Sequence, residues 1–591
     1  NRIFRKQHLI PMKFFITSLI QSGLQALQQE GLQVPEDSSI MIERPRDRSH
    51  GDFSSNIAML LAKKMGMSPR ALAEKLLLLI PEHVDLLKVE IAGPGFLNFY
   101  VNESYLAKAL STMMTSPTLG ASPVSEPQCV VVDYSSPNLA KEMHVGHLRS
   151  TVIGDALVRI LTFQGQRVIR QNHVGDWGTQ FGMLLAHLQD QASTESVSTQ
   201  LKDLEDFYRA AKKRFDMEPD FAEKSRMMVV KLQSGDPQCQ TLWKTFIDIS
   251  ITHCQAVYQR LGTLLELQDL QPESAYNADL PVVVTALAEQ QLLREDQGAQ
   301  CVFLPEFKDK NNEPLPVIIQ KSDGGYLYAS TDLAALRYRQ ATLHADRILY
   351  VVDARQALHF RQIFTLARLA KFVSPQMQLE HVDFGMVLDK AGRPFKSREG
   401  GVTKLTELLD EAERRAEALV HKKNPEGDRA FQKNIAQTIA IASIKYADLS
   451  KNRSSDYMFD WDTMLSFEGN TAPYLLYAYT RMQSVLEKAK GVEGVTDTSL
   501  QFSTEADINL VKQLLCFGET IDAAAHKSMP HLLCLYLYEL ASLFSSFYES
   551  SPILAAENPI VRATRLRLVQ WTSEVLKKGL ELLGINTLDR M

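Results

Sequence analysis

The chain of 591 residues is 45% hydrophobic and 23% charged, and it carries a formal net charge of −6 at pH 7. Such a chain exceeds what one hydrophobic core supports, so we expect about three or four domains. The mildly acidic balance excludes a strong overall positive field, so any RNA contact must use local basic patches. No apolar run approaches a membrane span, and the six cysteines lack Cys-x-x-Cys or zinc-finger spacing. We therefore expect a soluble, cytoplasmic protein with no disulfide framework and no bound metal.

Residues 12–122 are predicted to form an N-terminal α+β domain. Apolar residues recur at helical spacing in three segments, 14–27, 56–64 and 69–80. Ser68 is the expected N-cap of the third helix, which has proline in its first turn. Strands are expected at 40–43 and 96–101, and a linker at 115–127.

Residues 123–405 are predicted to form a Rossmann-type catalytic domain. Strand-like runs occur at 129–134, 166–170, 300–304, 317–319 and 347–352, with helical patterns between them. A charged helical stretch at about 190–262 reads as an insertion. Parallel strands joined by helices imply a doubly wound sheet that binds ligands at the carboxyl ends of its strands. Residues 406–591 are almost entirely helical in pattern, which predicts a C-terminal helical bundle.

The most informative pattern is His144-Val145-Gly146-His147, between the first of these strands and a helix. Glycine lets a nucleotide approach the backbone, and a helix N-terminus attracts phosphate. Two imidazoles three residues apart lie on the same side of a helical turn and can bind one phosphate chain. A pair of structural histidines beside a turn is the alternative interpretation.

The longer segment from Ser135 to Thr151, Ser-Ser-Pro-Asn-Leu-Ala-Lys-Glu-Met-His-Val-Gly-His-Leu-Arg-Ser-Thr, resembles the HIGH signature of class I aminoacyl-tRNA synthetases in its arginyl form. The resemblance implies that a substrate carboxylate attacks the α-phosphate of ATP, with no protein nucleophile. It makes His144, His147 and Lys141 the groups that position the phosphates and supply cations. The implied ATP site comprises His144, Gly146, His147, Gly175, Asp176, His359, Met386 and Val387. Several of these could equally be strand-end turns or core residues.

A second phosphate-binding element is implied at Phe395-Lys396-Ser397-Arg398, which resembles the KMSKS loop of the class. Pro394 replaces the first lysine of that motif. Many arginyl-tRNA synthetases share this departure, and Lys141 resembles the lysine that compensates for it. Lys396 and Arg398 are the remaining candidate catalytic cations of the loop.

A guanidinium is planar and always charged, so an arginine pocket needs carboxylates in paired geometry. By resemblance, Glu273 and Asp332 are the two acids that read the side chain. Tyr328 packs beside the guanidinium, Asn138 reads the α-amino group, and Gln356 adds a polar contact. Helix capping is an alternative role for Asp332.

RNA contacts are implied at both ends of the chain. The C-terminal region is similar to the anticodon-binding domain of arginyl-tRNA synthetases, and the N-terminal domain is similar to the extra domain that touches the tRNA D-loop. The implied tRNA-binding residues are Phe96, Asn98, Tyr474, Tyr477, Arg481 and Met591. The aromatic residues could instead belong to the core.

Taken together, the resemblance implies an arginine–tRNA ligase that uses ATP with Mg²⁺ as a substrate complex and has no tightly bound cofactor. The implied partners are tRNA(Arg), L-arginine and ATP, and the expected state is a monomer without membrane contact. Family members generally need bound tRNA for the first step. The alternatives are another class I synthetase, a His-x-Gly-His nucleotidyltransferase acting on a small metabolite, or a non-enzymatic RNA-binding paralogue.

Overall fold

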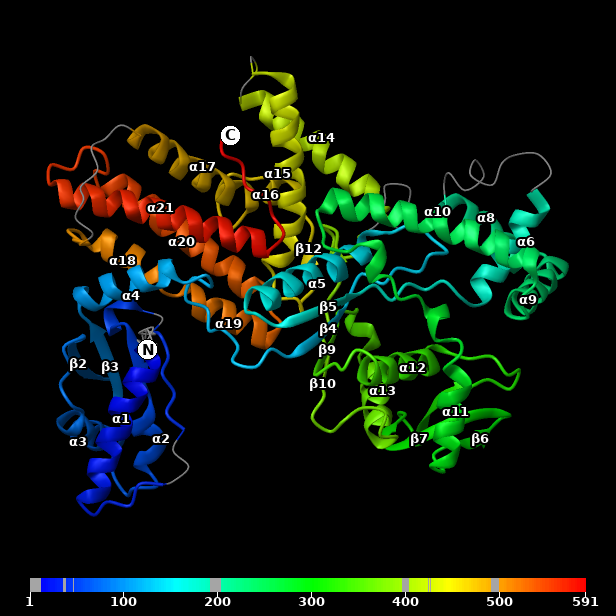
Figure 1. Ribbon diagram of the computed structural model, residues 1–591, viewed down its shortest axis with the longest axis horizontal. Helices are drawn as coiled ribbons and strands as arrows, with labels where there is room; N and C mark the ends of the chain where they lie inside the picture. The colour runs from blue at the N-terminus through cyan, green and yellow to red at the C-terminus, as the bar shows by residue number, and fades with distance from the viewer. Residues whose placement is uncertain are drawn as a thin grey trace, which may run out of the picture. The chain divides into compact units, whose positions relative to one another are not determined.

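The computed structural model describes residues 12–35, 39–45, 47–191, 204–395, 403–423, 425, 427–490 and 499–591 (Figure 1). The chain divides into two compact units, each described by itself below. The first unit comprises Asn1–Gly120, Lys488–Phe517 and Leu543–Thr572. The second comprises Ala121–Glu487, Gly518–Ser542 and Ser573–Met591. No described helix is both long and apolar enough to cross a membrane.

The first unit is built on a three-stranded antiparallel sheet in the order β1-β3-β2. Its strands are β1 (Phe53–Ser55), β2 (Leu86–Ala92) and β3 (Phe96–Val101). Its helices are α1 (Met12–Gln29), α2 (Ile57–Ala62), α3 (Pro69–Leu79), α4 (Glu103–Thr115) and α18 (Glu505–Leu514). The three helices predicted for this region are confirmed, and the Ser68 side chain accepts the predicted capping bond from the Ala71 amide at 3.2 Å. The expected strand at 40–43 is wrong, since Glu43 forms only an isolated bridge with Ser54.

The second unit contains a parallel sheet in the order β10-β9-β4-β5. Its strands are β4 (Cys129–Asp133), β5 (Arg167–Gln171), β9 (Arg347–Tyr350) and β10 (Gln378–His381). The chain leaves β4 for β5 on one side and later returns to β9 and β10 on the other. A doubly wound sheet opens a crevice at such a switch point, at the carboxyl ends of the strands.

Helix α5 (Val145–Phe163) follows β4 and packs closely on the residue after that strand. A Cβ on Gly154 would lie only 2.3 Å from the Tyr134 side chain, so this approach requires glycine. Helix α5 therefore begins at the carboxyl end of the central strand, which is where the crevice opens.

Two of the predicted strands belong to a different sheet from the one expected. The runs at 300–304 and 317–319 lie in β7 (Ala299–Lys308) and β8 (Pro314–Gln320), which form an antiparallel sheet with β6 (Arg294–Asp296). A short connection through Asp309 turns β7 into β8, and so short a loop permits only antiparallel pairing. The buried faces of β7 and β8 share a core with α11 (Leu280–Glu289), α12 (Tyr328–Ala341) and α13 (Ala357–Leu369).

The helical insertion is confirmed. The stretch expected at about 190–262 contains α8 (Leu204–Met217), α9 (Pro219–Gln233) and α10 (Pro237–Leu261), and the preceding helix α6 (Thr179–Gln191) packs with them. Phenylalanines pack together in its interior, with ring centroids 5.9 Å apart for Phe181 and Phe246 and 6.3 Å apart for Phe207 and Phe246. Because α6 starts directly after the loop that follows β5, the insertion is rooted at the edge of the crevice.

The C-terminal region is helical, as predicted. Its helices are α14 (Leu405–Lys423), α15 (Arg429–Leu449), α16 (Trp461–Met464), α17 (Ala472–Ala489), α18, α19 (Phe517–Lys527), α20 (His531–Ser550) and α21 (Pro559–Leu582). A short strand, β12 (Tyr457–Met458), pairs in parallel with β11 (Val387–Leu388). The boundary between the two compact units falls inside α17, α19, α20 and α21.

Candidate functional site

The loops at the carboxyl ends of β4 and β5 are joined by backbone hydrogen bonds. The Leu139 amide donates to the Gly175 carbonyl at 2.8 Å, and the Gly175 amide donates to Pro137 at 3.1 Å. The preceding residue of the second loop, Val174, accepts a bond at its carbonyl from the amide of Glu273 at 3.0 Å. These bonds bring Asn138, Gly175 and Glu273, three of the predicted site residues, to one wall of the crevice.

The histidine pair, His144 and His147, is held by the first turn of α5. The His144 Nδ1 accepts the Gly146 amide at 3.0 Å, and the His147 Nδ1 accepts the His144 amide at 3.0 Å. The ring centroids lie 4.0 Å apart. A nitrogen that accepts a backbone N–H carries no proton, so each neutral ring holds its proton on Nε2. Both rings can therefore donate a hydrogen bond from Nε2.

Both histidines are held neutral. Burial, together with the charge of Lys141 and Arg355, lowers the pKa of His144. Burial and the neighbouring His144 lower the pKa of His147 to about 3. These imidazoles are therefore neutral hydrogen-bond donors, and Lys141 and Arg355 place positive charge beside them. Arg355 was not predicted, and its guanidinium is bound to Asp353 at 2.7–2.8 Å.

The Lys141 ammonium lies 4.3 Å from the centroid of the Tyr208 ring, which belongs to helix α8 of the insertion. Its charge acts on both histidines. The structure thus places Lys141 beside the histidine pair, as predicted, with an aromatic neighbour that the sequence did not suggest.

Lys396 and Arg398 lie outside the described residues, but both flanks of their loop are described. On one side the Phe395 amide donates to the Val387 carbonyl at 3.0 Å. On the other side the segment at 403–405 pairs with the turn before α5, with the Val145 amide 3.1 Å from the Thr403 carbonyl and the Leu405 amide 2.9 Å from Met143. The second flank therefore meets the histidine pair directly.

The acidic pocket, defined here as Glu273, Tyr328, Asp332 and His359, lies at the start of α12. Burial, followed by the charges of Asp332 and Asp176, raises the pKa of Glu273 to about 8. Both Glu273 and Asp332 also contribute to raising the pKa of Tyr328, after burial. Two carboxyls and a tyrosine, all predicted as arginine contacts, are therefore near enough for their charges to interact.

His359 lies in this pocket rather than standing apart from it. Its Nε2 is 2.6 Å from the Asp332 Oδ2. We expected His359 to border the adenine, and the structure instead pairs it with one of the two acids. Gln356, a turn earlier at the end of a short 3-10 helix (Ala354–Gln356), is exposed.

Helix α12 is fixed by a fully buried arginine that the sequence did not single out. Arg339 donates to Asp133 and to Gln171, both at 2.6 Å, at the ends of β4 and β5. Because Asp332 lies seven residues earlier on α12, this anchor sets where its carboxylate stands. A buried arginine between two strand ends looks like an ordinary helix-surface residue in the sequence.

Asp176 supports the pocket and does not face a nucleotide directly. Its carboxylate accepts bonds from the Ser274 amide at 2.9 Å and the Ser274 hydroxyl at 2.5 Å, and Trp243 Nε1 donates to its carbonyl at 2.8 Å. The side chain is 1% exposed. Its expected role as an ATP contact is therefore corrected to that of a brace for the segment carrying Glu273.

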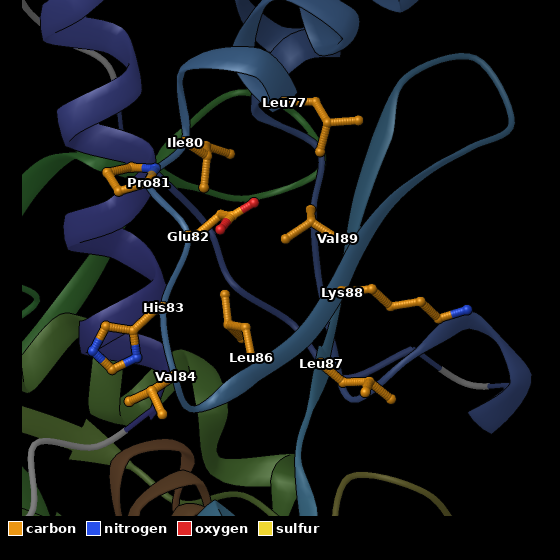
Figure 2. A pocket seen from close by; sticks show the side chains of 10 residues that line it. All are labelled: Leu77, Ile80, Pro81, Glu82, His83, Val84, Leu86, Leu87, Lys88 and Val89. Atoms are coloured by element: carbon orange, nitrogen blue, oxygen red, sulfur yellow. The ribbon is translucent and has the colours of Figure 1, made fainter.

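A small apolar hollow of about 240 Å³ lies behind that brace, lined by Leu139, Val174, Trp243 and Ile247 among others. A larger hollow of about 580 Å³, in the first unit, lies between the end of α3 and β2 (Figure 2). Its lining includes Leu77, Ile80, His83 and Leu86 and contains none of the predicted site residues.

Met386 and Val387 stand at the start of β11. The Met386 amide donates to the Asp456 carboxylate at 2.6 Å, and its side chain is 36% exposed, whereas Val387 is buried. The preceding Gly385 carbonyl accepts a bond from Arg149 at 2.8 Å. Helix α5 is thus hydrogen-bonded to the segment before β11, the strand that precedes the loop carrying Lys396 and Arg398.

Four buried charges form what we call the charged seam, between helices α5 and α15. Arg149 pairs with Asp448 at 3.1 Å. Six residues further along α5, the negative charge of Asp155 acts to raise the pKa of Lys445. The Lys445 ammonium donates to the Leu261 and Gly584 carbonyls at 2.8 and 2.6 Å. Burial nevertheless lowers the pKa of Lys445 to about 8. No local sequence pattern marks these four residues as a cluster.

The predicted RNA contacts differ in their surroundings. Asn98 is 3% exposed, and its Oδ1 accepts a bond from the Ser54 hydroxyl at 2.8 Å, so its expected role as a tRNA contact is corrected to sheet structure. Phe96, at the start of β3, is partly exposed. The ring of Tyr474 packs against Tyr538 with centroids 5.7 Å apart.

Tyr477 and Arg481 form an exposed pair on α17. The Arg481 guanidinium lies 4.9 Å from the Tyr477 ring centroid and donates to its hydroxyl at 3.1 Å. Tyr477 is 42% exposed and Met591 is 38% exposed. Among the described residues, no group of three acidic, histidine or cysteine side chains could hold a metal ion.

A parallel sheet with a histidine pair at the start of the helix after its first strand, and with residues 403–405 paired to the turn before that helix, fits a class I aminoacyl-tRNA synthetase. Residues 109–461 match the model of the class I tRNA synthetase (R) catalytic domain, residues 475–591 match the DALR anticodon-binding domain, and residues 15–101 match the arginyl-tRNA synthetase N-terminal domain.

The chain is 57% identical over 583 residues to the arginine–tRNA ligase of Stutzerimonas stutzeri and 56% identical over 585 residues to that of Alcanivorax borkumensis. Each alignment covers 98% of this chain and 100% of the relative. Among solved structures, the arginyl-tRNA synthetase of Plasmodium falciparum matches with a TM-score of 0.84 and 29% identity, over 98% of this chain and 99% of that one. That of Thermus thermophilus matches with a TM-score of 0.77 and 26% identity, over 97% and 100%. The chain belongs to the arginyl-tRNA synthetase family.

Proposed function

We propose that the crevice at the carboxyl ends of β4, β5 and β9 attaches arginine to its tRNA at the expense of ATP. The chain is a class I arginine–tRNA ligase by family. The observation that carries the assignment to this crevice is the acidic pocket, where the charge of Asp332 raises the pKa of the buried Glu273. Burial of two acids together is unfavourable unless a cation joins them, and a guanidinium can pair with both.

In the first step, an arginine carboxylate oxygen attacks the α-phosphorus of ATP, which is supplied as its Mg²⁺ complex. The bond from that phosphorus to the bridging oxygen breaks, and pyrophosphate leaves. His144 and His147 donate Nε2–H groups to the phosphates, while the positive charge of Lys141 stabilises the negative charge that develops on the leaving pyrophosphate. Lys396 and Arg398 are proposed to add mobile cations from their loop.

In the second step, the 2′-hydroxyl of the terminal adenosine of tRNA attacks the acyl carbon of arginyl-adenylate, and AMP leaves. Because no protein nucleophile takes part, the residues of the crevice act by holding the two reactants in line.

The substrate contacts follow the geometry of the crevice. Glu273 and Asp332 would pair with the guanidinium while Tyr328 packs on it, and Asn138 would read the α-amino group from the adjoining loop. Gln356 is proposed as a further polar contact at the rim. His359, bound to Asp332, is reassigned from the adenine to this pocket. Gly146, Gly175, Met386 and Val387 are proposed to line the ATP site by their backbone.

For the tRNA, we propose that Tyr477 and Arg481 stack on anticodon bases, because an exposed ring with a guanidinium over it suits single-stranded RNA. Tyr474 would support that face, with Met591 near the anticodon and Phe96 near the D-loop. We further propose domain limits of 12–122, 123–405 and 406–591, and a cytoplasmic monomer.

The test is ATP–pyrophosphate exchange with each proteinogenic amino acid, with and without tRNA(Arg). We expect exchange with arginine alone, and only when tRNA is present. Exchange with another amino acid would overturn the roles of Glu273 and Asp332. A folded protein that binds ATP but exchanges with no amino acid would instead act as a small-metabolite nucleotidyltransferase.

A further inference from the structure

The helical insertion has no role in the reaction as described so far, yet one of its side chains reaches Lys141. We propose that Tyr208 is a positioning residue that holds the Lys141 ammonium beside the histidine pair, ready for the triphosphate. This inference rests on the phosphate-binding role proposed for Lys141.

The position of Tyr208 is set by the interior of the insertion. Its neighbour Phe207 is 6% exposed and packs against Phe246 and His187, with centroids 6.3 and 4.9 Å away. Phe246 also packs against Phe181 of α6. Because α6 begins directly after the loop that follows β5, this aromatic core fixes α8 relative to the crevice. The Tyr208 ring is therefore presented by a rigid support.

The backbone of Lys141, the other partner in the contact with Tyr208, is also held in place. Its amide donates to the Asn138 carbonyl at 3.3 Å, which places Lys141 in a turn directly before the histidine pair. The long side chain would otherwise be free to adopt many rotamers. With the ammonium 4.3 Å from the Tyr208 ring centroid, its charge acts on both His144 and His147.

A ring suits this task better than a carboxylate. An acid would hold the same ammonium, but its negative charge would repel the triphosphate that the lysine must meet. An aromatic face attracts the cation without adding a formal charge, and the N–H groups that point away from the ring remain available as donors.

The acids near Tyr208 on α8 are directed elsewhere. Glu205 and Asp206 pair with Arg209 at 3.3 and 3.8 Å. Among the residues that the structure describes, no carboxylate forms an ion pair with Lys141. Within the described ranges, the positive charge of Lys141 therefore has no ion-pair partner at the phosphate end of the crevice.

The experiment measures kcat/KM for ATP in arginine- and tRNA-dependent pyrophosphate exchange, using the full chain. Tyr208→Leu should lower kcat/KM about two- to fivefold, the range expected for a partly exposed cation–π contact. Tyr208→Phe keeps the ring face and should stay near the parent value. Phe215→Leu is the matched control, because it removes a ring on the same helix that lies over Lys212 and Arg226. It should leave kcat/KM unchanged.

A double-mutant cycle with Lys141→Met separates positioning from general structural support. If Tyr208 acts through Lys141, Tyr208→Leu should have no further effect once Lys141 is replaced. An equal loss in both backgrounds would overturn the proposal, as would no loss or a gain from Tyr208→Leu alone, or a loss from Tyr208→Phe. If Lys141→Met itself leaves kcat/KM for ATP intact, the proposed role of Lys141 fails, and that result is distinct from a failure confined to Tyr208.

Discussion

Binding of arginine should release a proton from Glu273. In the empty pocket, burial and the charges of Asp332 and Asp176 raise the pKa of Glu273 to about 8. A guanidinium between the two acids favours the ionised carboxylate and lowers that pKa again. At pH values below 8 the carboxyl must therefore lose its proton before it can pair with arginine, so affinity should fall as the pH falls.

The size of the effect follows from the pKa. With a free-site pKa of about 8 and a much lower value in the complex, the dissociation constant should be about 25-fold weaker at about pH 6.5 than at about pH 8.5. About one proton should leave per arginine bound at the lower pH, and only a small fraction of one at the higher pH.

Isothermal titration calorimetry in two buffers of different ionisation enthalpy measures both quantities. Glu273→Gln keeps the shape of the side chain without its charge. This variant should bind arginine weakly and with little pH dependence over the same range. An affinity of the parent protein that does not change with pH, proton uptake instead of release, or an unchanged pH dependence in Glu273→Gln would refute the reasoning.

Three further predictions concern other parts of the structure. His144→Ala should lower the turnover of pyrophosphate exchange on the order of 100-fold, because a preorganised donor to the phosphates is lost, and calorimetry should find arginine affinity unchanged. Asp332→Asn should weaken arginine binding by about 2 to 4 kcal/mol, and an unaltered KM for arginine would rule out that contact. Arg149→Met leaves the buried Asp448 without its partner and should destabilise the protein by about 3 to 5 kcal/mol, seen as a lower thermal midpoint. Adding Asp448→Leu should restore most of that loss, and a double variant no better than the single one would contradict the account.

The sequence predicted the site well where one short segment carries both its chemistry and its local structure. His144, Gly146 and His147 form the first turn of a helix after a buried strand, and periodicity alone identifies both elements. The acids Glu273 and Asp332 are far apart in the chain, and only the family resemblance brought them together.

The wrong and missed predictions have a common physical cause. Residues that are far apart in the chain but in contact in the fold leave no local pattern in the sequence. The apolar runs at 300–304 and 317–319 predict buried strands, but they do not indicate to which sheet the strands belong. The short turn between the two strands is what permits only antiparallel pairing. Asn98 looks like an exposed polar residue until its bond to Ser54 is seen. Arg339 likewise gives no sign in the sequence that two strand ends surround it.

The charged seam limits how the protein can be divided and recombined. The boundary at residue 405 that the sequence suggests would leave Arg149 and Asp155 in one fragment, with Lys445 and Asp448 in the other. Arg149 and Asp448 would then lose their buried partners, and a C-terminal half taken from a distant relative would have to supply a carboxylate at the position of Asp448. Exchange of the helical region between relatives should therefore succeed only when the junction lies beyond α15, so that this helix is inherited together with the helix that carries the histidine pair.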